Sequence, residues 1–488
     1  MLNELKNELN MTQTLNGAAA YYSSLSDCLD LFSAIGSMRN DHKEAEKMLI
    51  RAFCESPDYA LRILFYARDI RSGLGERDIF RSLLHRLAFF RPQTVKKNLK
   101  YISEYGRFDD LFALFDTPCE NAMLELVSEQ LREDIANMQE NKSISLLGKW
   151  MPSVNCSDVH RREQAKKISR KLKICEKEYR QTLSKLRAYT HIIETHLCEK
   201  KYDFDYEHIP SNASFKYRKA FIRNDKERYI SYMEAVGNGD KKLNADTLFP
   251  YEIIRKCMNA DPADSDERRT LDTVWRSMSD SLSAEMKGKN ALAVIDGSGS
   301  MYTRAEPAPI HIALSLGLYF AERTEGYFRD HFITFSERPR LVEIKGDDIY
   351  SKVKYCMNYD EVANTNLEKT FVLLLKTALK NNIPQKEMPE YLYIISDMEF
   401  DCCTIYDETI FNAMKKLYSE HGYKLPQIVF WNVNHLSYQV PVTKDEEGAV
   451  LVSGFSKNLF NYCIQAGSTP LEFMKSVLDS ERYRCLSA

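Results

Sequence analysis

The hydrophobic pattern of the sequence changes near Ala291, and this change limits the possible folds more than any other feature. From there, short apolar runs alternate with helical stretches: Ala291–Ile295 and Tyr391–Ile395 are almost wholly apolar, and Ile310–Arg323 is apolar on nearly every side. Buried strands that alternate with helices predict a mostly parallel sheet with helices on both faces. We therefore expect residues 286–488 to form a doubly wound, Rossmann-like α/β domain, with ligands bound outside the carboxyl ends of its strands.

The residues before this point show the helical period instead. One apolar face, with the i, i+3, i+4, i+7, i+8 spacing of a helix, consists of Ala45, Met48, Leu49, Ala52 and Phe53. Pro57 ends this run, and comparable faces separated by short turns continue along the chain. Short helices joined by short turns predict an all-α, HEAT-like helical array over residues 1–285. Asp261–Glu267, which is rich in acidic residues and contains one proline, is predicted to link the array to the α/β domain.

Length and composition agree with a multidomain protein. A chain of 488 residues is too long for one hydrophobic core, because single cores stop growing near about 250–300 residues. The 12 cysteines include no CxxC pair, and no apolar run approaches the roughly 20 residues of a membrane helix. The first residues lack the apolar run of a signal peptide. These features predict a cytoplasmic protein with reduced thiols and no membrane partner.

A small polar loop follows the first predicted strand. Asp296-Gly297-Ser298-Gly299-Ser300 places one carboxylate and two hydroxyls at alternate positions, and its glycines allow the loop to curl. Asp397 comes just after the strand Tyr391–Ile395, so a second carboxylate is expected at the same edge of the sheet. Converging oxygen ligands suit a small hard cation such as Mg²⁺, which keeps several waters and needs few protein ligands.

These pieces resemble the metal-ion-dependent adhesion site of von Willebrand factor A-type domains, an Asp-x-Ser-x-Ser loop followed by a distant Thr and a more distant Asp. The resemblance implies five metal ligands, namely Asp296, Ser298, Ser300, Thr365 and Asp397. It also implies a bound Mg²⁺, or Mn²⁺ or Ca²⁺, with an open coordination position for a partner's Glu or Asp side chain. The chain departs from the family pattern at Gly297, where an apolar residue is more usual, and at Asn364, where Gly is common.

Two other interpretations of this loop stay open. An A-type fold could keep the loop without binding metal, although uncompensated buried charges cost stability. A metal-assisted hydrolase would need a base beside the ion, and Glu399 and Asp401 are candidates, although both are expected at the rim. We find no convincing nucleophile–His–acid set, and Gly73-x-Gly75 lies between helices rather than after a strand, unlike a phosphate-binding loop. We therefore expect that the protein is not an enzyme.

A second resemblance covers most of the chain and depends on short blocks in a fixed order. The blocks are Ala67–Arg71, Gly75–Asp78, Tyr105–Leu111, Gly148–Ser153, Ile209–Ser211, Leu248–Pro250, Asp397–Asp401 and Phe430–Asn432. With a helical array followed by an A-type domain, they resemble the Ro ribonucleoprotein (TROVE) architecture and, more closely, an uncharacterised Ro-like family of domains of unknown function. The resemblance implies a ring closed by the A-type domain, with the chain's two ends close in space. It also implies that RNA binds a basic face and that single-stranded RNA ends enter the hole.

A basic segment in the middle of the chain offers such a face by charge alone. Basic residues far outnumber acidic ones between Arg161 and Arg187, although the whole chain has a formal net charge of -3. Clustered Lys and Arg supply most non-specific affinity for nucleic-acid phosphates. The residues predicted to bind RNA are Arg161, Arg162, Lys166, Lys167, Arg170, Lys171, Lys173, Lys177 and Arg180. A solvated amphipathic helix would carry the same charges, and that interpretation stays open.

The predicted function is therefore a Ro-like RNA-binding scaffold, whose RNA is small and non-coding or structured with single-stranded ends. The competing class is a protein-binding adaptor, in which the array is a scaffold and the metal site docks an acidic side chain of a protein partner. The charge distribution favours RNA and the metal site favours a protein. The two are compatible on different faces of one molecule.

Overall fold

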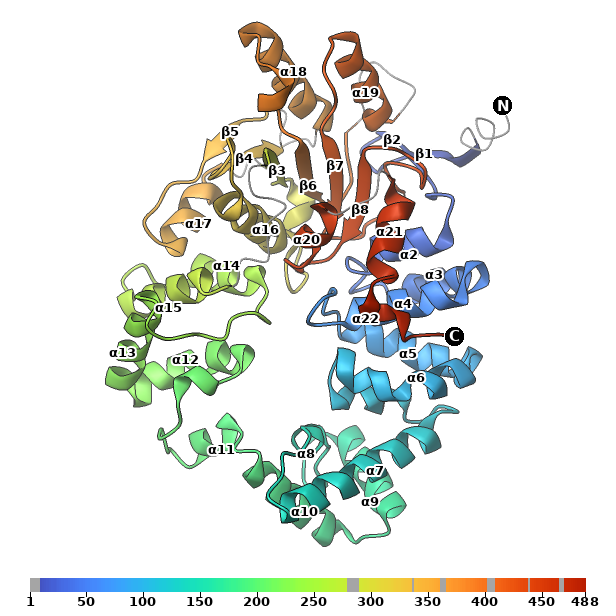
Figure 1. Ribbon diagram of the computed structural model, residues 1–488, viewed down its shortest axis with the longest axis vertical. Helices are drawn as coiled ribbons and strands as arrows, with labels where there is room; N and C mark the ends of the chain where they lie inside the picture. The colour runs from blue at the N-terminus through green and yellow to red at the C-terminus, as the bar shows by residue number, and fades with distance from the viewer. Residues whose placement is uncertain are drawn as a thin grey trace.

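The computed structural model of the chain contains a helical N-terminal part and a C-terminal α/β part (Figure 1). It describes residues 9–278, 289–335, 338–359, 366–401, 409–437, 439–464 and 469–488. The predicted multidomain organisation is confirmed at this level: an α-helical region precedes a region with a mixed, mainly parallel sheet. None of the helices in these ranges is both long and apolar enough to span a membrane.

The N-terminal part begins with a two-stranded hairpin and continues as helices that pack on their neighbours in the chain. The hairpin strands are β1 (Met11–Gln13) and β2 (Ala19–Tyr21). The helices are α2 (Asp27–Ala34), α3 (His42–Glu55), α4 (Pro57–Arg68), α5 (Asp78–Phe90), α6 (Pro92–Tyr105), α7 (Glu120–Gln139), α8 (Leu147–Trp150), α9 (Val159–Leu172), α10 (Glu176–Tyr189), α11 (Ile193–Cys198), α12 (Ser211–Asn224), α13 (Lys226–Gly237), α14 (Pro250–Asn259) and α15 (Ser265–Arg276).

Local sequence signals set several helix boundaries. Ser56 follows α3 and caps α4, because its hydroxyl accepts the backbone N–H of Tyr59. Pro57 occupies the first turn of α4, where its missing N–H leaves no hydrogen bond unmade. Asp158 caps α9 by accepting the N–H of Arg161 at 3.1 Å. The helix break predicted at Pro57 is therefore confirmed.

A buried ion network joins α4 and α5 to the turn after α6. Asp110 accepts the guanidinium of Arg68 at 2.7 Å and that of Arg81 at 2.6 Å, and Arg81 also pairs with Asp109 at 2.7 Å. Gly106 leaves room for this arrangement, since a Cβ there would lie 2.2 Å from Oδ2 of Asp110. Loss of one partner would leave an uncompensated buried charge, so the network holds the consecutive helices in one arrangement.

The prediction that Asp261–Glu267 is a linker is wrong, because the second half of this segment begins helix α15. The carboxylate of Asp264 caps α15 by accepting the N–H of Glu267 at 3.0 Å. Glu267 is itself buried and forms an ion pair with Arg218 of α12 at 2.6 Å. The helix dipole favours acidic residues at the first turn of a helix. A helix that begins with several acids therefore has the same composition as an acidic linker, and the sequence alone did not distinguish the two.

The C-terminal part is built on a six-stranded sheet with the order β5-β4-β3-β6-β7-β8. Its strands are β3 (Ala291–Asp296), β4 (His331–Phe335), β5 (Leu341–Glu343), β6 (Tyr391–Ser396), β7 (Gln427–Asn432) and β8 (Ala449–Ser453). Only β5 runs antiparallel to its neighbour among these described strands. The helices are α16 (Pro309–Arg323), α17 (Ile349–Met357), α18 (Leu367–Asn381), α19 (Ile410–Glu420), α20 (Leu459–Ile464), α21 (Pro470–Leu478) and α22 (Glu481–Arg484).

The centre of the sheet brings two polar loops to one edge. β3 and β6 are parallel neighbours, with Ile295 opposite Ile395, so the residues that end or follow these strands meet at their carboxyl ends. The buried helix α16 packs against β3, β4 and β6. Its Gly317 permits close approach, because a Cβ there would lie 2.3 Å from the Cδ1 atom of Ile295. The predicted alternation of buried strands and helices is confirmed.

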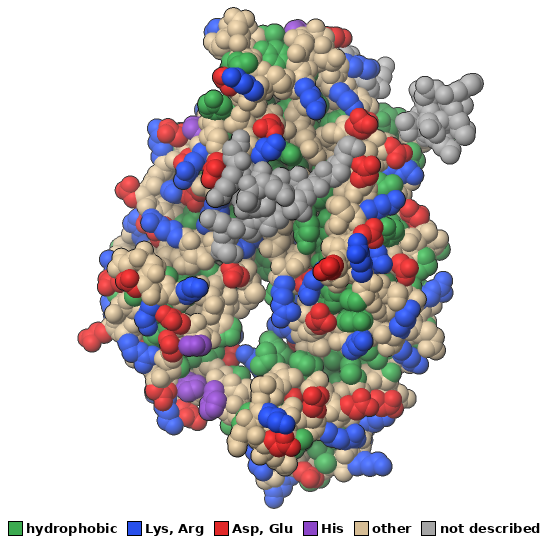
Figure 2. All heavy atoms as spheres, viewed as in Figure 1, with side chains coloured by type: hydrophobic (Ala, Val, Ile, Leu, Met, Phe, Trp, Pro, Cys, Tyr) green, Lys and Arg blue, Asp and Glu red, His purple; other side chains and the backbone are tan. Residues whose placement is uncertain are grey.

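The two parts close into a ring (Figure 1). At one end of the array α2 lies against β8, and the backbone N–H of Gly36 donates to the hydroxyl of Ser453 at 3.0 Å. At the other end α14 packs on α16 and α17. Figure 2 shows an opening through the molecule between the two arms of the array. The expected ring is thus present, with the α/β part between the two ends of the helical array.

The C-terminal residues also pack on the first helices. Arg482 donates two hydrogen bonds to the carboxylate of Asp69, at 2.7 and 3.0 Å, and the hydroxyl of Tyr483 donates to it at 3.1 Å. Arg62 of α4 pairs with Asp479 at 2.6 Å. The expectation that the C-terminal domain packs back on the N-terminal helices is therefore confirmed.

The two arms of the array meet at Phe455, which follows β8. The Phe455 ring lies 4.4 Å from the ring of Phe249, just before α14, and 4.2 Å from the guanidinium of Arg39, just before α3. Arg39 pairs with Glu76 at 2.7 Å. Burial raises the pKa of Glu76 to about 7, although Arg39 opposes the shift.

Candidate metal centre and basic face

The first loop of the candidate metal centre begins at Asp296, the last residue of β3, which is fully buried. Its Oδ1 atom accepts the N–H of Ser298 at 2.8 Å, and its Oδ2 atom accepts the hydroxyl of Ser396, the last residue of β6, at 2.6 Å. Burial, followed by the nearby charge of Asp397, raises the pKa of Asp296 to about 7. Residues at the ends of both central strands thus fix the Asp296 carboxylate by hydrogen bonds. Its buried environment disfavours a negative charge that has no compensating cation.

The two serines of the loop lie beside this carboxylate. The hydroxyl oxygens of Ser298 and Ser300 are 3.0 Å apart, because the loop curls and a 3₁₀ turn follows at Gly299–Tyr302. Ser298 is buried and Ser300 is half-buried, while Gly299 between them is exposed. Alternate side chains of the loop therefore converge, as its glycines and spacing predicted.

The second carboxylate belongs to Asp397, directly after β6, and is almost fully buried. Its Oδ1 atom accepts the N–H of Glu399 at 3.2 Å, whereas its Oδ2 atom has no hydrogen-bond donor in the described part of the chain. Burial raises the pKa of Asp397, and the neighbouring hydroxyl of Ser300 opposes the shift. Two buried carboxylates with raised pKa values and one orphaned oxygen fit a divalent cation, which would favour their ionised forms.

The structure brings together four of the five predicted metal ligands. Asp296, Ser298, Ser300 and Asp397 meet at the carboxyl ends of β3 and β6. Thr365, the fifth predicted ligand, lies outside the described residues. Among described residues, no three His, Cys, Asp or Glu side chains cluster as a metal site, so the centre depends on two carboxylates and two hydroxyls. That donor set suits Mg²⁺, which retains several waters in protein sites.

Two further residues at this edge were missed by the sequence reasoning. The sequence predicted no role for Ser396, yet its hydroxyl donates to Asp296 and also accepts the N–H of Met398 at 3.0 Å. Glu399 was expected at the rim but is buried, so that expectation was wrong. The position of Ser396 at the end of a strand and beside Asp397 could have indicated its place in the site. Nothing near Glu399 in the sequence indicated that its side chain is buried.

The N-terminal hairpin fixes the loop that carries Asp397. The carboxylate of Glu399 accepts the N–H of Leu15 at 2.7 Å, the side-chain amide of Gln439 at 2.9 Å and the hydroxyl of Ser437. The hydroxyl of Thr14 donates to the carbonyl oxygen of Phe400 at 2.6 Å. A segment almost 400 residues away in the sequence therefore holds the loop that carries Asp397 in place.

The predicted RNA-binding residues lie on α9, on α10 and in the turn between them, on the side of the ring opposite the sheet (Figure 1). Those that are exposed are Arg161, Arg170, Lys173, Lys177 and Arg180, whereas Arg162, Lys166, Lys167 and Lys171 are half-buried. None of the five exposed residues forms an ion pair within the described ranges.

Three of the half-buried residues already have acidic partners. Lys166 pairs with Glu163 of the same helix at 3.0 Å, and Lys171 pairs with Glu125 of α7 at 3.2 Å. Lys167 pairs with Asp116 and, at 3.2 Å, with Glu120. The contacts of Lys167 and Lys171 attach α9 to α7 and the turn before it, and all three lysines contribute less free charge than the sequence suggested. We name the five exposed residues the basic face.

Comparisons with known proteins agree with the two-part organisation of the chain. Residues 14–117 and 120–287, together more than half of the chain, match the family described as "Domain of unknown function (DUF2828)". Residues 290–482 match a second family, "Domain of unknown function (DUF7788)".

Two individual proteins are similar over most of the chain. An uncharacterized protein of Acanthamoeba polyphaga mimivirus is 27% identical over 514 residues, which cover 96% of this chain and 87% of that protein. The crystal structure of the Deinococcus radiodurans RO (RSR) protein is 12% identical with a TM-score of 0.35, covering 90% of this chain and 92% of that one. On the family match over more than half of its length, the chain belongs to the DUF2828 family.

Proposed function

We propose that the protein is a Ro-like RNA-binding scaffold, with a von Willebrand A-type domain that closes a HEAT-like helical array. The observation that carries the proposal is the basic face, five exposed Lys and Arg side chains on a chain whose formal net charge is -3. Phosphates are bound by clustered cations that are free to approach them. The basic face lies at the far side of the ring from the sheet (Figure 1).

The ring supports this proposal by its shape. A basic face on the rim of a ring can position a structured RNA, while the opening beside it can receive a single-stranded end (Figure 2). A small non-coding RNA, or a structured RNA with single-stranded ends, is therefore the proposed ligand.

The α/β domain is proposed to carry a divalent-metal adhesion site. Its ligands would be Asp296, Ser298, Ser300 and Asp397, with Thr365 as the fifth, and the metal would be Mg²⁺, Mn²⁺ or Ca²⁺. Support comes from the convergence of the four described side chains and from the orphaned Oδ2 atom of Asp397. An open coordination position of the metal would accept a carboxylate from a protein partner.

We also propose that this site is not catalytic. A metal-assisted hydrolase would use a base beside the ion, and Glu399 was the nearer candidate. Its carboxylate is buried and accepts hydrogen bonds from Leu15, Ser437 and Gln439, which oppose a role as a mobile proton acceptor.

The second candidate function is a protein-binding adaptor that uses the metal site alone. The observation that favours it is that the basic face and the candidate metal site lie on opposite sides of the ring (Figure 1). Because of this separation, the metal site can bind a partner whether or not the basic face binds RNA.

One purification distinguishes the two functions. The native protein, isolated without nuclease, should show an absorbance ratio at 260 and 280 nm that indicates nucleic acid, and sequencing should recover small structured RNAs. A nucleic-acid-free protein that binds no added RNA would reject the scaffold and leave the adaptor.

A further inference from the structure

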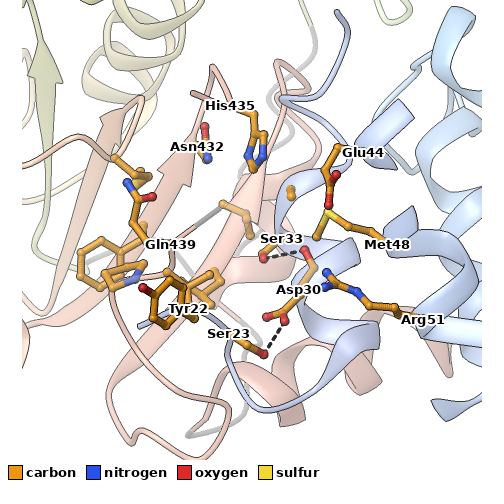
Figure 3. A pocket seen from close by; sticks show the side chains of 17 residues that line it. Tyr22, Ser23, Asp30, Ser33, Glu44, Met48, Arg51, Asn432, His435 and Gln439 are labelled. Carbon is orange, nitrogen blue, oxygen red and sulfur yellow. Dashed lines mark hydrogen bonds between the residues drawn. The ribbon is translucent and has the colours of Figure 1, made fainter. Parts of the chain in front are cut away.

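A cavity of about 330 Å³ lies between the first helices and the carboxyl ends of β7 and β8 (Figure 3). Asp30, Glu44 and Met48, from α2 and α3, line one side, and Asn432 and Gln439, from β7 and the segment after it, line the other. Its volume lies at the lower end of the range of small-ligand sites, roughly 300–1,000 Å³. The cavity is separate from the basic face, and Met398 in its wall directly follows Asp397 of the candidate metal centre.

Most of the wall suits a flat ring. The thioethers of Met48 and Met398 and the ring of Phe430 line the cavity, and Leu451 extends this apolar surface. Thioether side chains adapt their shape to aromatic ligands, and aromatic rings stack on one another. Tyr22, which is 64% exposed, lines the same cavity and offers a second ring.

The polar part of the wall is rich in hydrogen-bond acceptors. The carboxylate of Asp30 is buried and accepts the hydroxyl of Ser23 at 2.5 Å and the N–H of Ser24 at 2.8 Å. Glu44 provides a second carboxylate, which accepts Lys47 at 2.7 Å. Each carboxylate oxygen has two lone pairs, so both groups can accept a further donor from a ligand.

Arg51, the arginine in the wall, pairs with neither of these two carboxylates, and Glu44 has Lys47 as its ion-pair partner. Arg51 is half-exposed and lies 3.4 Å from Asp27, which is outside the cavity lining. The amides of Asn432 and Gln439 complete the polar wall and can both donate and accept. Carboxylates and side-chain amides are among the groups that proteins use to contact the edges of bases.

We propose that this cavity binds a planar heterocycle with an exocyclic amino group, of the nucleobase type. The ring would lie among Met48, Met398 and Phe430, and its amino edge would donate to Asp30 or Glu44. The proposal goes beyond RNA binding by the basic face and does not depend on it. The base could belong to a free nucleoside or to the unpaired end of an RNA.

Pairs of nucleosides that differ in the amino edge test the proposal on the full-length protein. Guanosine and cytidine should bind, measured by isothermal titration calorimetry and by a rise in melting temperature. Inosine and uridine, which lack the amino group, should bind about ten-fold more weakly, because the exocyclic donor to the carboxylate is then missing. Equal binding within each pair, or no binding by guanosine and cytidine, would overturn the proposal.

Three variants locate the binding. Glu44→Gln should weaken guanosine and cytidine binding, whereas Glu46→Gln, on the same helix but outside the cavity lining, should not. Ala34→Leu fills the cavity without touching its polar groups and should abolish binding in a protein that still unfolds cooperatively. Unchanged affinity in both cavity variants would overturn the assignment.

A competition experiment separates the two sources of the base. Short single-stranded RNA ending in guanosine should displace bound guanosine if the site receives an RNA end. Failure to compete, with guanosine binding intact, would assign the site to a free nucleoside. Both outcomes support a base-binding cavity, and a cavity that holds only water would show neither.

Discussion

Replacement of Asp296 by Asn separates metal binding from folding, because the side chain is fully buried and keeps its size. Its pKa rises from the ordinary 3.8 to about 7. Since one pKa unit corresponds to about 1.4 kcal/mol, ionised Asp296 costs the metal-free native state at most about 4 kcal/mol. The native state loses this stability as the pH rises from the pKa of Asp296 in the unfolded chain to its pKa in the folded protein. Above the folded-state pKa the loss is complete. Asn avoids that cost.

The substitution also has an opposing cost. The carboxylate accepts donors on both oxygens, from the N–H of Ser298 and the hydroxyl of Ser396. The amide of Asn accepts only one of them, and an unsatisfied buried donor costs about 1–3 kcal/mol. Without metal, at a pH one unit above the folded-state pKa, Asp296→Asn should therefore be at least as stable as the native protein.

Metal should reverse this order. The native protein gains about 2.7 kcal/mol when free Mg²⁺ exceeds the dissociation constant about 100-fold, and the variant should gain nothing. The assay is urea unfolding in EDTA and in excess MgCl₂, with Asp347→Asn, an exposed aspartate of the same domain, as the control. Equal stabilisation of Asp296→Asn and native protein would refute the ligand assignment. A loss of several kcal/mol by the variant in EDTA would refute the burial argument.

Other predictions concern the contacts that hold the ring and the metal loop. Glu399→Gln should lower Mg²⁺ affinity about ten-fold in calorimetry, because the Glu399 carboxylate accepts hydrogen bonds from Leu15 and Gln439 that position the loop of Asp397; unchanged affinity would show that the hairpin does not position the site. Gly36→Ala puts a Cβ 2.6 Å from the carbonyl oxygen of Ser453 and should destabilise by about 1–3 kcal/mol in thermal unfolding. Gly237→Ala, whose Cβ meets nothing within 4 Å, should not destabilise. Glu76→Gln should gain stability over the native protein as the pH rises from 4.5 to about 7, because the native protein then ionises a buried carboxyl; a pH-independent difference in urea unfolding would contradict this.

Local patterns in the sequence predicted the features that depend on near neighbours. The apolar runs located β3, β6 and the buried helix α16, and the spacing of Asp296, Ser298 and Ser300 predicted their convergence. The carboxyl ends of parallel neighbours must share an edge, so Asp397 could also be placed. These inferences needed only strand period, helix period and the geometry of a parallel sheet.

Features that depend on distant contacts could not be predicted in this way. Leu15 and Glu399 are joined by a hydrogen bond across 384 positions, and nothing near either residue indicates the other. The acids of Asp261–Glu267 indicated a linker because their partner, Arg218, lies on another helix. From the sequence, Lys167 was expected to be a free charge, because its partners Asp116 and Glu120 lie about 50 positions earlier in the chain.

The most direct test of the central proposal is RNA binding by the basic face, measured as a function of salt. The variants are Arg170→Glu, Lys173→Glu and Lys177→Glu combined, and a matched control that reverses Lys376, Lys380 and Lys386, which are equally exposed on the α/β domain. Lys167 and Lys171 are left intact, because their ion pairs join α9 to α7 and its preceding turn.

Each lost contact between a cation and a phosphate of a single strand reduces the slope of log K against log salt by about 0.7. The proposal predicts that the basic-face variant binds RNA more weakly, with a slope reduced by about 2, while the control retains native binding. No RNA binding by the native protein at low salt, or native affinity and slope in the basic-face variant, would contradict it.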